Sequence, residues 1–204
     1  MSARCLRQLV STLRLRLRLS ATWGNEGFCL SALLVLAVGL VGLQRLLELR
    51  LSRRNERILR ARGALERGQR HYPVLVAMHA LWLLSTLVEG LLRGPRIPSW
   101  WPVPLVLFLL AQLLRYWAIL TLGEYWNTRV LVVPGARLVA RGPYRYLRHP
   151  NYVAVAVEIA TFPLIFGAWV AALVFSALNA ALLYGRISTE DRALAQLAKR
   201  GGGG

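Results

Sequence analysis

Five long apolar blocks dominate the chain and predict an all-α membrane protein. They span residues 28–51, 72–92, 102–122, 152–166 and 168–187. A helix needs about 20 residues to cross the hydrocarbon layer of a bilayer, a length that the first three blocks and the fifth reach. The fourth is shorter and contains Pro163, so we expect it to be tilted or broken, and Gly167 allows a tight turn into the fifth. The pattern therefore predicts a polytopic transmembrane helical bundle of about five spanning helices that ends in a C-terminal helical hairpin.

The segments outside the blocks define the predicted domain organisation. Residues 1–27 are rich in Arg and lack an apolar core followed by small residues, so we expect a disordered N-terminal extension in preference to a cleaved signal peptide. Residues 28–200 form the predicted integral membrane domain, and residues 201–204 a flexible tail of glycines. Between them, the segment 123–150 carries turn signals at 134–135 and 142–143, which predict a short hairpin or an irregular cap over the bundle.

The formal net charge of +17 is explained by the distribution of basic residues between the two sides of a membrane. The segments 50–71, 123–150 and 185–204 hold 17 of the 26 basic residues, and the segments 1–27 and 93–102 hold 7. Cytoplasmic loops of membrane proteins carry the excess of Lys and Arg. We therefore expect the three basic segments to face the cytosol, and we expect no nucleic-acid partner. Cys5 and Cys29 lack the spacing of metal ligands, so no metal site is predicted.

Ionisable side chains inside the apolar blocks are candidates for function, because charge within a membrane is costly. Arg45 and Glu48 are three residues apart and can pair, or can simply reach toward the inner face. Glu158 lies beside the densest polar cluster of the chain, and we expect it to be functional. A structural role is open for three further residues, His79, Glu89 and Arg115.

The densest polar cluster joins the segment 123–150 to the fourth block. It reads Gly142-Pro143-Tyr144-Arg145-Tyr146-Leu147-Arg148-His149-Pro150-Asn151-Tyr152. Pro150 suits the first turn of a helix, where free backbone N–H groups favour an anion. Arg186 and Glu190 are four residues apart, on one helical face and on the same predicted side of the membrane. Together the two groups offer cations for a carboxylate and carboxylates for an amine, a ribose or a sulfonium. Membrane anchoring by the arginines, with a surface ion pair, is the alternative interpretation.

These two groups resemble the motifs of the isoprenylcysteine carboxyl methyltransferase family. The segment 148–152 with Gly142-x-Tyr144 before it, and Arg186-x-x-x-Glu190-Asp191 after a helical hairpin, carry the resemblance over about residues 120–195. Looser similarity at 53–56, 63–64 and 71–73 resembles a bacterial branch that O-methylates long-chain alkylpyrones and alkylresorcinols. The resemblance implies S-adenosylmethionine as the methyl donor and a lipophilic acceptor. The residues that it implies for cofactor binding are Tyr144, Arg148, His149, Pro150, Tyr152, Arg186 and Glu190. We expect catalytic roles for Arg186 and Glu190, and for Glu158 because it lies beside the polar cluster.

The sequence therefore predicts an S-adenosylmethionine-dependent O-methyltransferase of a bacterial cytoplasmic membrane, with its active site at the cytosolic face. The acceptor would be a carboxylate, an enol or a phenol of a lipid or polyketide, with Glu158 or His149 as the base for a phenol. The alternatives are a phospholipid N-methyltransferase and a non-catalytic membrane protein that retains the fold. A membrane reductase of sterol type is disfavoured, because the chain contains no G-x-G-x-x-G fingerprint.

Overall fold

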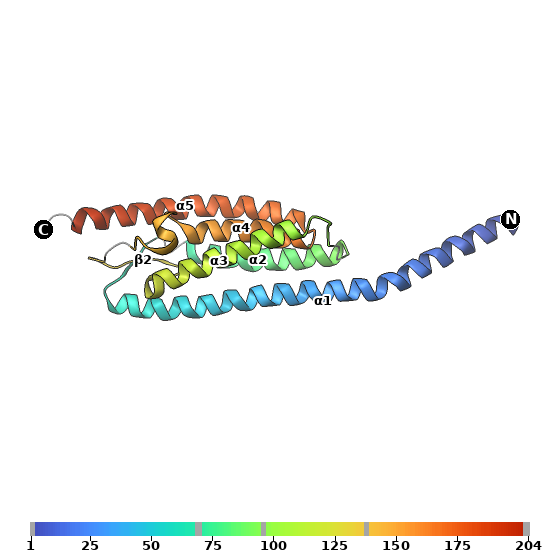
Figure 1. Cartoon of the computed structure of the whole chain (residues 1–204), viewed down its shortest axis with the longest axis horizontal. Helices are drawn as coiled ribbons and strands as arrows, with labels where there is room; N and C mark the ends of the chain where they lie inside the picture. The colour runs from blue at the N-terminus through green and yellow to red at the C-terminus, as the bar shows by residue number, and fades with distance from the viewer. Residues whose placement is uncertain (1–2, 68–70, 95–96, 137–138, 202–204) are drawn as a thin grey trace.

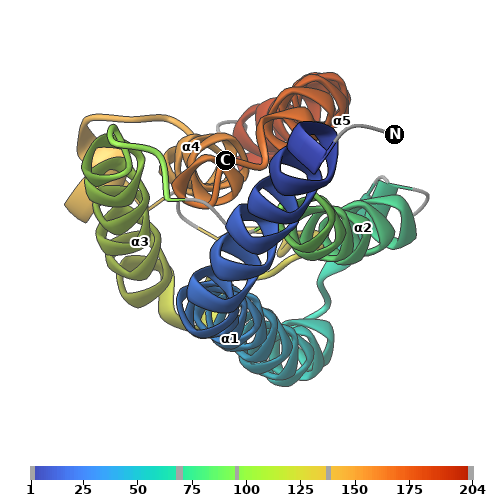
Figure 2. The ribbon, with the colours of Figure 1, turned by 90° about the vertical axis from the view of Figure 1, so that its right-hand side faces the viewer.

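The computed structural model describes residues 3–67, 71–94, 97–136 and 139–201, and within this part five α-helices form an elongated bundle. They are α1 (Ala3–Ala61), α2 (His71–Leu92), α3 (Pro102–Leu122), α4 (Pro150–Ile165) and α5 (Trp169–Gly201). Figure 1 shows the helices side by side along one axis, with the N-terminal part of α1 projecting past the others. In the end view of Figure 2, α4 lies between α3 and α5.

The fold confirms the predicted all-α membrane bundle. Residues 27–61 of α1 and the helices α2, α3 and α5 are each long and apolar enough to cross a membrane, and the 16-residue α4 is a shorter apolar helix, as expected. The outward surfaces remain apolar, with Leu120 79% and Leu113 67% exposed on α3. Exposed leucines at this density are suited to contact with lipid chains and not with water.

Helices α1 and α5 are longer than their apolar blocks. The backbone is helical from Ala3, so the segment that we expected to be a disordered extension is continuous with α1 in the structure. Leu, Arg and Ala, which dominate this segment, are strong helix formers. Helix α5 ends at Gly201, and residues 202–204 of the predicted tail lie outside the described residues.

Helix α4 continues through Pro163 instead of breaking there. A proline has no N–H group, so the carbonyl of Ile159, four residues earlier, loses its partner within the helix. The indole Nε1 of Trp82 on α2 donates a hydrogen bond to this carbonyl at 3.2 Å. Trp82 and Ile159 are almost fully buried, with 0% and 1% exposure, in the main apolar core. A neighbouring helix therefore satisfies the polar group that the proline leaves free.

The start of α5 is bound by α2. The Glu89 carboxylate accepts hydrogen bonds from the backbone N–H groups of Val170 and Ala171, at 3.1 and 2.7 Å, and pairs with Arg93 at 3.0 Å. The first N–H groups of a helix have no partners within it, and they favour negative charge. Glu89 therefore has a structural role at this end of the bundle.

The opposite end, which we call the polar end, carries the short elements between the helices: β1 (Leu65–Arg67), η1 (Gly123–Tyr125), β2 (Val130–Val132) and η2 (Gly142–Arg145). The strands are antiparallel, with Leu65 opposite Val132 and Arg67 opposite Val130. Of the two forms expected for 123–150, a short hairpin or an irregular cap, the hairpin is wrong for β2, which pairs with β1 in the connection between α1 and α2. Leu138, in the other half of that expected hairpin, lies outside the described residues. The pairing binds two loops of the polar end together.

Candidate functional site

Tyr152, on the first turns of α4, connects the two predicted halves of the site. Its hydroxyl accepts a hydrogen bond from Arg186 Nε at 2.8 Å and donates one to the Glu190 carboxylate. The Arg186 guanidinium also lies 5.6 Å from the centre of the tyrosine ring, and it donates to the carbonyl of Thr128. The structure therefore brings the segment 148–152 and the pair Arg186–Glu190 together through one phenol group.

Arg148 and His149 both reach Asp191 on α5. Arg148 Nη2 and His149 Nε2 each lie 3.1 Å from Asp191 Oδ1, and the His149 ring stacks on Tyr152 with centroids 5.3 Å apart. His149 is the N-cap residue of α4, and Pro150 begins the helix as predicted. The Arg148 side chain is 72% exposed, so its contact with Asp191 lies at the surface. Asp191 thus contacts the site, although sequence reasoning counted it only as a further carboxylate of the motif and not among the binding or catalytic residues.

These residues surround a cavity of about 550 Å³ at the polar end, which we call the polar cavity. Six of the seven residues predicted for cofactor binding line it: Tyr144, Arg148, His149, Tyr152, Arg186 and Glu190. The seventh, Pro150, is buried and begins α4, but it does not line the cavity. Burial, with a smaller contribution from the nearby Glu190 charge, raises the pKa of Tyr144 well above its ordinary value. Tyr144 therefore faces the cavity as a neutral hydroxyl near neutral pH.

Two buried residues of α1 that sequence reasoning did not assign to the site bind the segment 123–128, part of which lines the polar cavity. Asn55 Nδ2 donates to the carbonyls of Gly123 and Trp126, at 3.1 and 2.7 Å. The Ser52 hydroxyl lies 2.7 Å from Thr128 Oγ1 and accepts the Thr128 backbone N–H at 3.0 Å. These bonds hold the Thr128 carbonyl where Arg186 donates to it. Their sequence signal was two small polar residues three apart, on one face of an Arg-rich helix end.

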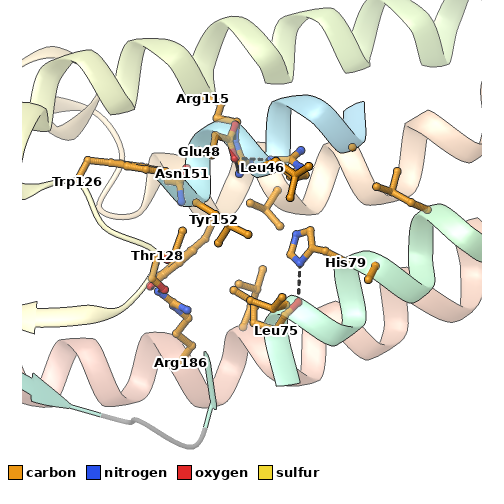
Figure 3. A pocket seen from close by; sticks show the side chains of 18 residues that line it. Leu46, Glu48, Leu75, His79, Arg115, Trp126, Thr128, Asn151, Tyr152 and Arg186 are labelled. Atoms are coloured by element: carbon orange, nitrogen blue, oxygen red, sulfur yellow. Dashed lines mark hydrogen bonds and ion pairs between the residues drawn. The ribbon is translucent and has the colours of Figure 1, made fainter. Parts of the chain in front are cut away.

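A second cavity of about 350 Å³ lies deeper in the bundle, and we call it the apolar cavity. Aliphatic side chains from several helices line it, among them Leu46, Leu75, Val155 and Leu183. Figure 3 shows Tyr152, Asn151 and His79 pointing into this space. The two cavities share four lining residues, Trp126, Asn151, Tyr152 and Arg186.

The shared wall contains polar atoms that lack hydrogen-bond partners among the described residues. They are Nε1 of Trp126, a residue only 2% exposed, and Oδ1 of Asn151. A buried donor or acceptor without a partner is costly, so such groups commonly mark a ligand or a water. Here one donor and one acceptor are free at the junction of the two cavities, where a reacting oxygen could bind.

Glu158 lies apart from the site that was predicted for it. It is fully buried, accepts from Arg45 at 2.5 Å and from Arg115 at 3.0 Å, and lines neither cavity within the described structure. Arg115 and Arg45 also pair with Glu48, at 2.6 and 2.9 Å. We call these four residues the four-charge cluster. Two positive and two negative charges compensate one another there, as buried charges require. This placement does not support Glu158 as a base that touches the acceptor.

Helices, motifs and cavities together define an integral membrane protein with a polar site that adjoins a lipophilic one. Comparison with known proteins assigns the family. Residues 104–196 match the family model described as "Isoprenylcysteine carboxyl methyltransferase (ICMT) family". The "Uncharacterized protein YpbQ" of Bacillus subtilis is 44% identical over 159 residues, which cover 78% of this chain and 95% of that protein. The chain belongs to the isoprenylcysteine carboxyl methyltransferase family.

A second relative extends the similarity to another bacterium. An "Uncharacterized protein" of Haemophilus influenzae is 26% identical over 154 residues, covering 75% of this chain and 90% of that protein. No solved structure matches the chain. Both relatives are matched over most of their length, and each match is longer than the range 104–196 of the family model.

Proposed function

We propose that this protein transfers a methyl group from S-adenosylmethionine to an oxygen atom of a lipophilic acceptor, at the cytosolic face of a bacterial cytoplasmic membrane. The observation that carries the proposal is the wall common to the two cavities. A charged, water-soluble donor and a greasy acceptor need different environments, yet their reacting atoms must meet in line. A polar cavity and an apolar cavity that share Asn151, Tyr152 and Arg186 meet both requirements.

The residues of the polar cavity fit S-adenosylmethionine. The volume of about 550 Å³ falls within the ordinary range for small-molecule sites. Arg148 and Arg186 can bind the carboxylate of the methionyl group, while Glu190 can bind its amine or the ribose hydroxyls. Tyr152 and Trp126 present aromatic rings, which favour a cation such as a sulfonium. When bound, the donor supplies an electrophilic methyl group.

The cytosolic orientation is supported by charge. The segments 50–71, 123–150 and 185–204 hold 17 of the 26 basic residues, and the parts of these segments that the structure describes belong to the polar end of the bundle. The positive-inside rule places such an end on the cytosolic side, where S-adenosylmethionine is available. The acceptor reaches the apolar cavity from the bilayer, and its class is a carboxylate, an enol or a phenol carried on an alkyl chain. Long-chain alkylpyrones and alkylresorcinols are acceptors of this kind.

The proposal is tested with the full-length protein in detergent. Isothermal titration with S-adenosylmethionine measures donor binding. Incubation with a lipid extract of the host, followed by mass spectrometry, measures products heavier by one methylene unit. We expect an oxygen-methylated lipid that is absent with a Glu190→Gln variant. If the product is methylated phosphatidylethanolamine, the protein is an N-methyltransferase and the proposal is wrong. If the folded protein binds no S-adenosylmethionine, its role is not catalytic.

A further inference from the structure

The apolar cavity contains a histidine that the proposed site does not use. His79, on α2, lines this cavity together with Arg45, Glu48 and Arg115. Those three charged residues are bound to one another, and Tyr152 and Arg186 are bound to each other. Among the described residues, His79 is the ionisable side chain of the lining that bonds to no other side chain, since its hydrogen bond goes to a backbone carbonyl of its own helix.

The hydrogen bond of His79 determines which ring nitrogen can accept a proton. Nδ1 lies 2.8 Å from the backbone carbonyl of Leu75. A carbonyl oxygen only accepts, so Nδ1 carries the hydrogen of the neutral ring, and Nε2 keeps a free lone pair. Figure 3 shows the ring extending from α2 into the cavity, with a dashed line for its hydrogen bond to Leu75. A lone pair in an otherwise apolar space is suited to accept a hydrogen bond from a ligand hydroxyl.

The charges of the cavity wall favour an uncharged acceptor. The four-charge cluster contains two arginines and two glutamates and is neutral as a whole. It therefore offers no uncompensated cation to an ionised group. The other cation of the lining, Arg186, is bound by the Tyr152 hydroxyl and the Thr128 carbonyl on the wall shared with the polar cavity, where the proposed function assigns it to the donor. Both bases considered from the sequence are engaged elsewhere, since His149 binds Asp191 in the polar cavity and Glu158 is held by two arginines.

We propose that His79 is the proton acceptor for the hydroxyl of the lipophilic acceptor, an inference that rests on the proposed function. Nε2 takes the proton as the O–H bond breaks. The oxygen gains the methyl group, and the electron pair of the broken carbon–sulfur bond remains on the sulfur of the sulfonium donor, which becomes a neutral thioether. The sulfonium charge is thus replaced by an imidazolium charge, whose proton passes to water when the product leaves. Tyr152 and Asn151, which line the same cavity, connect this space to the polar one.

The test compares His79→Gln with Met78→Leu, a near-isosteric control at the neighbouring buried position, which does not line the cavity. Donor affinity is measured first and stays unchanged in both variants. Turnover is then measured on alkylphenols of graded acidity. Loss of a general base costs about 10²- to 10⁴-fold in rate. We expect His79→Gln to lose at least 10²-fold on the least acidic phenol and progressively less on phenols that are already ionised, while Met78→Leu follows the wild type throughout.

A second readout requires no turnover. With ring-labelled histidines, of which the chain has three, nitrogen NMR identifies the His79 Nε2 signal by its absence in His79→Gln. We expect this signal to move when an alkylphenol binds without donor, and to stay in place when the corresponding methyl ether binds. The role of His79 is overturned if His79→Gln loses the same factor of turnover on all phenols, or if the Nε2 signal does not move when the alkylphenol binds. If the wild type binds no donor or methylates no lipid, the proposed function itself fails, independently of the variant.

Discussion

The Tyr152 hydroxyl lies 2.8 Å from Arg186 Nε, on the wall that the polar and apolar cavities share. The same hydroxyl donates to Glu190, so one neutral group of α4 orients both charged groups of α5. Arg186 is only 7% exposed, and a buried guanidinium depends on such partners. In the proposed function, the geometry of donor binding therefore depends on contacts between the two helices of the C-terminal hairpin.

Removing this hydroxyl should weaken donor binding. In Tyr152→Phe, Arg186 and Glu190 each lose a charge-assisted hydrogen bond, and such a bond contributes about 1.5–3 kcal/mol. We expect S-adenosylmethionine to bind about tenfold to hundredfold more weakly, measured by titration calorimetry in detergent. The matched control is Tyr184→Phe, at an 82% exposed position of α5, which should bind the donor like the wild type. Equal affinities of Tyr152→Phe and the control would contradict the role of Tyr152.

Neutralising Glu158 should destabilise the protein without removing its chemistry. Glu158→Gln leaves Arg45 and Arg115 with one carboxylate between them, and breaking a buried ion pair costs about 3–5 kcal/mol. We expect this decrease in the free energy of unfolding, measured by chemical denaturation in detergent. Glu124→Gln, which breaks the exposed pair with Arg62, should cost less than about 1 kcal/mol.

Turnover of the folded fraction separates this structural role from catalysis. Because Glu158 lines neither cavity, folded Glu158→Gln should methylate phenolic acceptors at nearly the wild-type rate. If Glu158→Gln instead loses as much turnover as His79→Gln, and the loss depends on phenol acidity in the same way, Glu158 takes part in the reaction.

The hydrogen bond from the Trp82 indole to the Ile159 carbonyl should stabilise the protein only when residue 163 is proline. Trp82→Phe leaves the Ile159 carbonyl unsatisfied, at a cost of about 1–3 kcal/mol beyond the packing loss. In a Pro163→Ala background the new backbone N–H can bond with this carbonyl within α4. We expect a smaller effect of Trp82→Phe there, measured as the coupling free energy of a double-mutant cycle. Additive effects would mean that the indole N–H does not compensate for the proline.

Protonation of Glu66 at acid pH should destabilise the fold at the polar end. Burial opposes ionisation of this carboxylate, but hydrogen bonds from Arg129 and Arg60 outweigh burial and lower its pKa below 4.5. A carboxylate with a lowered folded-state pKa stabilises the fold above its unfolded pKa, and this contribution is lost as the pH falls through the folded value. We expect the wild-type unfolding midpoint to drop more steeply than that of Glu66→Gln below about pH 4.5, measured by thermal denaturation. Parallel curves would exclude Glu66 as the source.

Much of the fold could be predicted from local sequence. The apolar blocks 72–92 and 102–122 coincide with α2 and α3 to within one residue, because transfer of a helix into lipid depends on its own composition. The motif 148–152 and the pair Arg186–Glu190 were likewise recognised as one site, since both lie at the same end of a helical hairpin. The end of α1 at Ala61 was missed, because an Arg-rich helical turn has no hydropathy signal.

The sequence by itself therefore determined the class of protein, the order of its helices and six of the residues that line the polar cavity. Tertiary structure alone decided which polar groups of separate helices meet. Glu158 is joined to arginines 113 and 43 residues away in the chain, β2 pairs with β1 from another loop, and His79 extends into the apolar cavity. The reason is that hydropathy reports the environment of a segment, whereas contacts depend on how each helix is rotated and packed against its neighbours.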